Sequence, residues 1–176
     1  MHVAVSAIGV DRPGIVAAVT GVLMDHGCNL EDTSMSILRG HFAMMLVVAV
    51  PPEEGAADLE AALAPAAEDL GLVVTVRSID DEAPASPPGQ PWQLAVYGTD
   101  RPGIVHRIAR LLAEQQVNIV DLTTRMVGVA EPVYVMLLDV TIPGTVDPEA
   151  LRAGLERLGR ELAVECSLHP ADVDVL

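Results

Sequence analysis

The stretch DRPGIV occurs twice in this chain, at Asp11–Val16 and at Asp100–Val105, and its residue types suit the binding of a small charged molecule. The start of a helix offers unpaired backbone N–H groups and a partial positive charge, both of which suit a carboxylate. Gly14 and Gly103 carry no side chain, so a ligand can approach the backbone closely. The proline of each copy stiffens the turn, which lowers the entropic cost of ordering it around a ligand. Each copy therefore predicts a place for a carboxylate.

Side chains near the two stretches can accept hydrogen bonds from the ammonium group that an amino acid carries beside its carboxylate. Asp11 and Asn29 offer oxygen atoms in the first copy, and Asp100 and Asn118 offer them in the second. Each of these residues also has a purely structural interpretation. The aspartates can cap helices, the asparagines can make local hydrogen bonds in turns, and the glycines can allow close helix–strand packing.

The similarity between the two halves extends far beyond six residues. A shift of 89 positions places Asn29 on Asn118, and after a three-residue insertion near 128–132 a shift of 92 places Met44 on Met136. Such self-similarity indicates one structural unit made twice. Between the units, the segment DDEAPASPPGQP at 80–91 combines acidic residues with prolines and predicts a solvated, stiff linker.

Hydrophobic periodicity predicts the same order of elements in both units. For the first unit the expected elements are a strand over 2–8, a helix with the apolar stripe Ile15, Val19 and Leu23, strands over 29–38 and 42–50 around a hairpin at Arg39–His41, a helix containing Leu59 and Leu63, and a strand over 72–79. Asp11 is the expected N-cap of the first helix, Pro13 lies in its first turn, and Gly27 ends it. Pro65 is expected to kink or shorten the second helix.

The second unit repeats this order. The expected elements are strands over 92–98, 117–127, 133–142 and 162–169, a helix with the stripe Ile104, Ile108 and Leu112, and a helix capped by Asp147 with Leu151, Leu155 and Leu158 inside. Six of the methionines are expected to fill the cores: Met24, Met35, Met44, Met45, Met126 and Met136.

A strand–helix–strand–strand–helix–strand order with right-handed crossovers produces a four-stranded antiparallel sheet with two helices on one face, the ferredoxin-like arrangement. The predicted fold class is therefore α+β, with ferredoxin-like βαββαβ domains at 1–79 and 92–169, the linker at 80–91 and a tail at 170–176. One face of each sheet is left uncovered by its own helices. Because a unit of about 80 residues buries a modest share of its surface alone, we expect the units to pair, either within the chain or in a homodimer.

Composition argues against several classes of function. The 176 residues carry a net charge of −15, which opposes direct nucleic-acid binding and disfavours anionic membranes. The longest apolar run, at 42–50, is far short of a bilayer span. The two cysteines lack CxxC spacing and the five histidines lack metal-ligand spacing, so we expect no metal and no cofactor. With no secretory leader, the expected location is the cytoplasm.

Tandem DRPGIV turns, each followed about 13 residues later by CNLED or VNIVD, resemble ACT domains, the regulatory modules that bind amino acids. Two adjacent units of this kind are similar to the glycine cleavage system transcriptional repressor family. The resemblance implies a regulator and not an enzyme, with a small amino acid such as glycine or serine as ligand and a regulatory protein as partner. In ACT modules the ligand lies where the turn and the start of the following strand face a neighbouring module. The implied ligand-binding residues are Asp11, Arg12, Gly14, Ile15 and Asn29, with Asp100, Arg101, Gly103, Ile104 and Asn118.

The sequence departs from some amino-acid-binding ACT modules at two positions of each turn. Those modules carry an imidazole two residues before the turn and an asparagine that opens it, whereas this chain has Gly9 before Asp11 and Gly98 before Asp100. An acidic residue at the opening repels a carboxylate and attracts an ammonium, which affects the expected pose of the ligand.

Three other functions are compatible with the same fold. RNA-binding versions stack bases on aromatic residues of the central strands, where we expect only Phe42 and Tyr134. A hydrolase of the acylphosphatase type needs an arginine near the first turn, for which Arg12 and Arg101 are the candidates. A ligand-free scaffold would use the paired sheets as a protein-docking surface.

Overall fold

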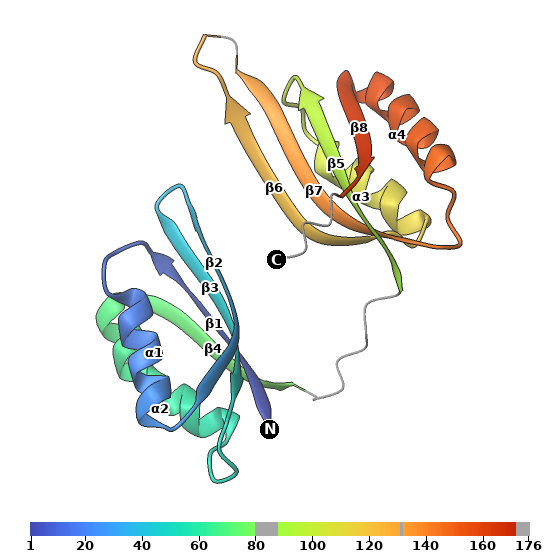
Figure 1. The fold of residues 1–176 in the computed structure, drawn as a ribbon. Helices are drawn as coiled ribbons and strands as arrows, with labels where there is room; N and C mark the ends of the chain where they lie inside the picture. Colours follow the sequence, from blue (N-terminus) through green and yellow to red (C-terminus); the bar gives the residue numbers. More distant parts are fainter. Residues whose placement is uncertain (80–87, 131, 172–176) are drawn as a thin grey trace. The chain divides into compact units, whose positions relative to one another are not determined.

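The computed structural model describes residues 1–79, 88–130 and 132–171, and its contacts divide the chain into two compact units, 1–84 and 85–176. Figure 1 shows the order of elements in each unit. The first unit contains β1 (His2–Val10), α1 (Ile15–Asp25), β2 (Asn29–Leu38), β3 (His41–Ala49), α2 (Ala56–Leu70) and β4 (Leu72–Ile79). The second contains β5 (Gly89–Gly98), α3 (Ile104–Glu114), β6 (Asn118–Val127), β7 (Val133–Pro143), α4 (Pro148–Leu162) and β8 (Val164–Pro170).

Each unit is a four-stranded antiparallel sheet with two helices on one face (Figure 1). The strand order is β2-β3-β1-β4 in the first sheet and β6-β7-β5-β8 in the second. Strands β2 and β6 are therefore edge strands, and each contains a bulge at the same repeat position, next to Asp32 and Asp121. This topology confirms the predicted α+β, ferredoxin-like βαββαβ fold of both units.

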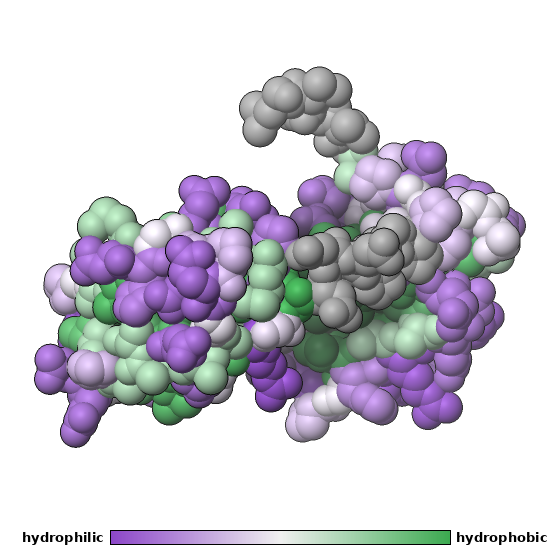
Figure 2. Space-filling view, turned by 90° about the horizontal axis from the view of Figure 1, so that it is seen from below, coloured by the Kyte–Doolittle hydropathy of each residue, from purple (hydrophilic) through white to green (hydrophobic). Residues whose placement is uncertain are grey.

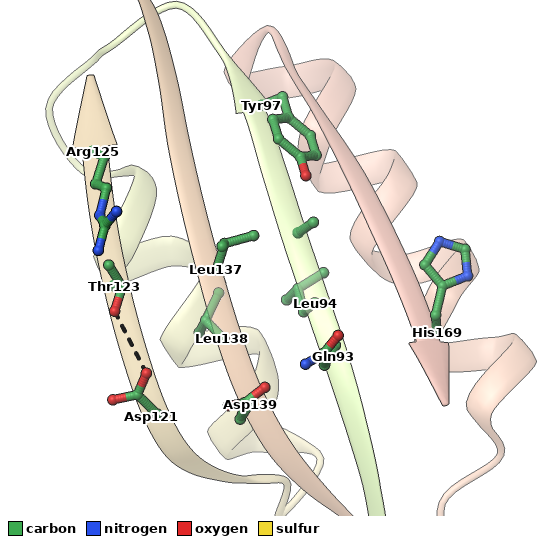
Figure 3. A pocket seen from close by; sticks show the side chains of 11 residues that line it. Gln93, Leu94, Tyr97, Asp121, Thr123, Arg125, Leu137, Leu138, Asp139 and His169 are labelled. Atoms are coloured by element: carbon green, nitrogen blue, oxygen red, sulfur yellow. Dashed lines mark hydrogen bonds between the residues drawn. The ribbon is translucent and has the colours of Figure 1, made fainter. Parts of the chain in front are cut away.

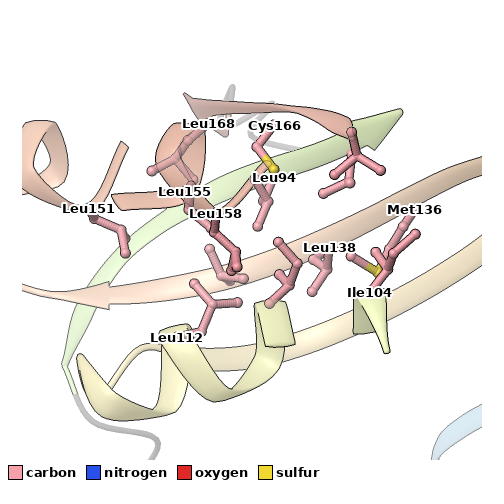
Figure 4. Packing of buried hydrophobic residues seen from close by; sticks show 14 of the residues in the cluster. Leu94, Ile104, Leu112, Met136, Leu138, Leu151, Leu155, Leu158, Cys166 and Leu168 are labelled. Atoms are coloured by element: carbon pink, nitrogen blue, oxygen red, sulfur yellow. The ribbon is translucent and has the colours of Figure 1, made fainter. Parts of the chain in front are cut away.

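The predicted helix stripes form the two cores. Ile15, Val19 and Leu23 of α1 are at most 1% exposed and pack beneath the alternate residues of β1 and β3. In the second unit the stripe of α3 and the leucines of α4 pack in the same way (Figure 4). Each large aliphatic side chain buried in this way contributes about 1.5–3 kcal/mol relative to exposure. The two clusters have no member in common, so each unit has its own core.

The methionine prediction is wrong for four of the six residues. Met44 and Met136 are buried, but Met24, Met35, Met45 and Met126 are 47–69% exposed. Met45 follows Met44 along β3, so the alternation of a strand turns it to the face that no helix of its unit covers. The space-filling view shows hydrophobic residues among hydrophilic ones on the surface of both units (Figure 2).

The helix ends differ from the prediction at the first helix of each unit. The N-cap of α1 is Gly14, at a φ of 98° and with no side-chain cap, so Asp11 is not the cap and Pro13 precedes the helix. Gly103 has the same role in α3 at a φ of 94°, which also excludes Asp100 as a cap. The reason is that the chain leaves the sheet through a left-handed residue, and this turn displaces the helix start by three residues.

Two other helix boundaries lie where the sequence predicts them. Gly27 follows the end of α1 at a φ of 67°; its N–H donates to the Met24 carbonyl, and the Cys28 N–H donates to the Leu23 carbonyl. Asp147 caps α4, because its carboxylate accepts a hydrogen bond from the Glu149 N–H at 3.0 Å. Both predictions are confirmed.

Pro65 does not shorten α2, which has 15 residues, as does α4. Strand β5 begins at Gly89, inside the predicted linker, and Leu162 belongs to α4 instead of the last strand. Residues 80–87 of the linker and 172–176 of the tail lie outside the described residues.

Candidate functional site

The two DRPGIV turns form matching helix starts. The first intrahelical bonds run from the Ala18 N–H to the Gly14 carbonyl and from the Arg107 N–H to the Gly103 carbonyl, both at 2.9 Å. The N–H groups that precede Ala18 and Arg107 in each helix therefore have no acceptor within the helix. They point out of the helix start, where the positive end of its dipole lies. Such a helix start suits an anionic group, and the carboxylate site at each turn stays a prediction.

Gly14 and Gly103 have open space beside their Cα atoms. A Cβ atom built at either position would have no neighbouring heavy atom within 4 Å. The packing interpretation of these glycines is therefore wrong, and their left-handed φ is the reason for a residue without a side chain. Apart from the two chain neighbours of each glycine, no described atom lies within 4 Å of these Cβ positions.

The side chains beside the turn are distributed over different surroundings. Ile15 and Ile104 are 1% exposed and point into the cores, so only their backbone N–H groups can meet a ligand. Asp11, Asp100 and Arg101 are exposed. The Asp11 N–H donates to the Gly40 carbonyl at 2.9 Å, which ties the first turn to the β2–β3 hairpin.

Arg12 extends toward the end of α2. Its guanidinium lies 3.7 Å from the position that a Cβ on Gly71 would occupy, and Gly71 is the C-cap of that helix. The C-terminus of a helix carries partial negative charge, which suits a guanidinium. This placement at the end of α2 lends no support to a phosphate-holding role.

Asn29 and Asn118 do not lie beside the turns of their own units. Asn29 pairs with Ala49, which pairs with His2 at the start of β1, whereas the turn follows Val10 at the end of β1. The eight-residue separation along the strand corresponds to about 26 Å. In the second unit Asn118 pairs with Thr141, again at the far end of the sheet from Gly98. One unit therefore cannot join both parts of the predicted site; a neighbouring module would have to supply the asparagine.

Gly9 and Gly98 explain why the turns lack the imidazole found in some ACT modules. A Cβ at Gly9 would lie 2.8 Å from the Gly71 carbonyl oxygen, and one at Gly98 would lie 2.8 Å from the Ala163 carbonyl oxygen. The helix–strand connection before β4 or β8 thus occupies the space of a side chain. An imidazole does not fit at either position without moving the backbone.

The two turns differ in one nearby aromatic residue. Tyr134 occupies in β7 the repeat position of Phe42 in β3, and its buried hydroxyl donates to the Met136 sulfur at 3.8 Å. Burial, and next the charge of Asp100, raise the pKa of the Tyr134 phenol. The second turn therefore lies near a phenol that the first turn lacks.

The aromatic residues also bear on RNA binding. Phe42 and Tyr134 are buried in the cores and cannot stack on bases. The expectation that they are the only aromatics of the central strands is wrong, because Trp92 and Tyr97 lie in β5, which is central in its sheet.

Comparison with known proteins decides the family. The sequence pattern of the ACT domain matches residues 2–77 and again 90–169. The chain belongs to the ACT-domain family. It is a tandem ACT protein whose two matched regions coincide with the two four-stranded sheets.

Relatives share one or both ACT units. A UPF0237 protein of Methanopyrus kandleri is 42% identical over 77 residues, which cover 43% of this chain and 86% of that protein. The glycine cleavage system transcriptional repressor of Escherichia coli is 25% identical over 124 residues, which cover 70% of this chain and 64% of the repressor. The aligned region thus spans less than two thirds of that repressor's length.

Two crystal structures match nearly the whole chain. A protein of unknown function from Galdieria sulphuraria has a TM-score of 0.82 at 26% identity, with 97% of this chain and 98% of that chain covered. A candidate glycine cleavage system transcriptional repressor has a TM-score of 0.72 at 18% identity, with 96% and 95% covered. The likeness to this second structure, at 18% identity, shows that the two proteins share a fold.

Two hollows lie on the uncovered sheet faces of the ACT units, and neither includes a residue of the DRPGIV turns. One, of about 490 Å³, lies on the uncovered sheet face of the second unit and includes Asp121, Arg125 and Asp139 (Figure 3). A smaller one, of about 250 Å³, lies on the corresponding face of the first unit, beside Ile8 and Met45. Sequence reasoning missed the larger surface, although the repeat alignment contains its signal: Asp139 stands where the first unit has Val47.

None of the described helices has the length and apolar character needed to cross a membrane. Within the described part of the chain, His, Cys, Asp and Glu form no group of three or more that could hold a metal ion.

Proposed function

We propose that this tandem ACT protein is a regulator that binds a small amino acid and transmits the binding event to a protein partner. The observation that carries the proposal is the helix start at Gly14 and Gly103. The N–H groups of the first helical turn have no acceptor within the helix, and no side chain beyond the chain neighbours lies within 4 Å of the point that a Cβ of the glycine would occupy. Such a corner can accept a ligand carboxylate. The relationship to the repressor of Escherichia coli supports a regulatory function and makes glycine and serine the first ligands to test.

The separation of Asn29 from Asp11 implies that each site is completed by a neighbouring module. Strand β2 is an edge strand whose last residue, Leu38, pairs with His41 at the turn end of the sheet. If another module adds its own edge strand antiparallel to β2, the start of that strand lies beside this end. Its asparagine then approaches the turn. The neighbouring module can belong to the same chain or to a second copy in a homodimer.

The partner is proposed to be a protein because the chain's net charge of −15 disfavours direct DNA contact. A repressor activity would then act through another DNA-binding protein. A cytoplasmic location is part of the same proposal.

Thermal unfolding in the presence of each of the twenty amino acids tests the proposal. A ligand at 100 times its Kd stabilises the folded state by about 2.7 kcal/mol. We expect a small amino acid to raise the Tm and its amide, which lacks the carboxylate charge, to have no effect. The double variant Gly14→Val with Gly103→Val should lose the response, whereas Gly40→Ala, in the hairpin turn, should keep it. No shift with any amino acid would refute sensing.

The same assay separates sensing from the ligand-free scaffold. A scaffold would show no amino-acid effect but would retain its partner after the two glycine substitutions. A sensor would lose the amino-acid dependence of partner binding in that variant. Asn29→Ala should weaken binding of the ligand without unfolding the protein. Light scattering with and without ligand reports whether a second copy associates when the ligand binds.

A further inference from the structure

The uncovered sheet face of the second ACT unit carries a hollow that is unlike its counterpart in the first unit. Its volume is about 490 Å³, and its lining comes from all four strands of the sheet (Figure 3). The hollow of the first unit, about 250 Å³, is lined by serines, alanine, isoleucine and methionines. Because the backbone pairing is the same in the two sheets, the difference lies in the side chains.

One end of the larger hollow is acidic. Asp121 and Asp139 are directly paired across β6 and β7, and Gln93 and His169 continue the same row across β5 and β8. Like charges placed directly opposite in a sheet destabilise it. The first unit avoids this cost, because the partner of Asp32 there is Val47. A bound cation would offset the repulsion in the second unit.

The other end carries the opposite charge. Arg125 and Tyr97 both pair with Val135, and this row lies four residues along β6 from Asp121. At the repeat positions of Arg125 and Tyr97 the first unit has Ser36 and Ile8. Figure 3 shows the Arg125 side chain extending along β6 toward Thr123, whose hydroxyl donates to Asp121 at 3.5 Å. Among the described residues, no ion pair within 4 Å joins Arg125 to a carboxylate.

The floor between the two ends is apolar. Leu137 and Ala95 are paired in the middle row, and Leu137 is 48% exposed because no helix of its unit covers this face of the sheet. The row of Thr123 lies two residues along the strand from the acidic row of Asp121, which corresponds to about 7 Å. The Arg125 guanidinium extends toward the row of Thr123. A free α-amino acid carries its two charges on adjacent carbons and is too short to reach both ends.

We propose that this hollow binds a zwitterion whose ammonium and carboxylate are separated by an apolar spacer, as in an ω-amino acid or a short peptide. The ammonium lies between Asp121 and Asp139, the spacer covers Leu137, and the carboxylate meets Arg125. This site is separate from the two turns, so it stands or falls independently of α-amino-acid sensing.

Calorimetric titration with a length series tests the proposal. The probes are glycine, β-alanine, γ-aminobutyrate, ε-aminocaproate and the dipeptide Gly-Gly, with hexylamine and caproate as single-charge controls. We expect affinity to rise at least tenfold from glycine to ε-aminocaproate, whose extended length matches the spacing, and each control to bind at least tenfold more weakly than ε-aminocaproate. Tighter binding of Gly-Gly than of ε-aminocaproate would indicate a peptide as the natural source.

Two variants copy the first unit into the second. Asp139→Val and Arg125→Ser should each lower the affinity for ε-aminocaproate at least tenfold, and Asp139→Val should keep or raise the Tm because it removes the like-charge pair. Glu60→Gln removes a single charge at an exposed position of α2 and should leave binding unchanged. The double variant Gly14→Val with Gly103→Val should also leave it unchanged. Binding without length dependence, or unaffected by both hollow variants, would overturn the proposal. So would a change of oligomeric state in Asp139→Val with no zwitterion binding in the parent protein, since the face would then join two copies.

Discussion

Gly98 lies directly against the carbonyl of Ala163, so that a Cβ at residue 98 would be 2.8 Å from the Ala163 oxygen and 2.9 Å from the Val164 Cα. Both contacts are with backbone, which cannot rotate away. This relationship holds the end of β5 against the connection between α4 and β8, directly before the second turn.

Gly98→Ala is therefore expected to destabilise the second unit by about 1–3 kcal/mol, the usual cost of overpacking. Urea unfolding followed by the fluorescence of Trp92 measures this, because Trp92 is the one tryptophan and packs on the core of that unit. Gly144→Ala is the matched control, since a Cβ there meets nothing within 4 Å and the change should stay within about 0.5 kcal/mol. Equal stability of the two variants would contradict the contact.

Replacement by alanine is expected to have opposite effects on stability at Gly14 and at Gly21. Neither has an atom within 4 Å of a built Cβ, but Gly14 has a φ of 98° whereas Gly21 lies inside α1. Gly14→Ala should cost about 1–2 kcal/mol for the left-handed backbone. Gly21→Ala should stabilise the protein by about 0.5–1 kcal/mol. Urea unfolding followed by circular dichroism compares the pair, and a destabilised Gly21→Ala would show that this part of α1 is packed more tightly than the structure indicates.

Pro65 interrupts the hydrogen bonding of α2 without ending the helix. It lies exposed in the interior of a 15-residue helix, and the repeat position in α4 is Arg157. Pro65→Arg restores a backbone N–H and removes the ring, so we expect a gain of about 1–3 kcal/mol in the free energy of unfolding. Pro148→Ala is the control, because a proline at the first helical position costs little. Thermal or urea unfolding measures both, and a loss of stability in Pro65→Arg would contradict the interpretation.

Cys166 predicts a loss of stability at high pH. Burial, and next the charge of Glu165, raise the pKa of this thiol from 9.0 to about 11. The folded state holds the proton more tightly than the unfolded state, so the stabilisation is complete below pH 9 and is lost as the pH rises toward 11. A shift of this size corresponds to about 2–3 kcal/mol.

Unfolding free energies measured at several pH values should therefore fall more steeply for the parent protein than for Cys166→Ala across this window. Cys28 is only partly buried and should react with a thiol reagent faster than Cys166 in the folded protein. Parallel pH profiles of the parent protein and the variant would refute the assignment to Cys166.

The sequence alone determined the repeat, the order of elements and the buried stripes. Ile15, Val19 and Leu23 were identified by their spacing, as was Asp147 as a cap, because these properties depend on residues within one or two helical turns. The prediction of a carboxylate site at each turn rests on a feature that is equally local, a glycine beside a helix start.

Only the tertiary structure decided which of the candidate residues meet. Asn29 follows α1 in the sequence, but strand pairing carries it to the opposite end of the sheet from Asp11. The space beside Gly98 is filled by Ala163, which is 65 positions away in the chain, and the hollow on the second sheet joins Asp121 to Asp139 across two strands. These relationships depend on register and crossover, which are set by the packing of distant segments and leave no periodic signal in the sequence.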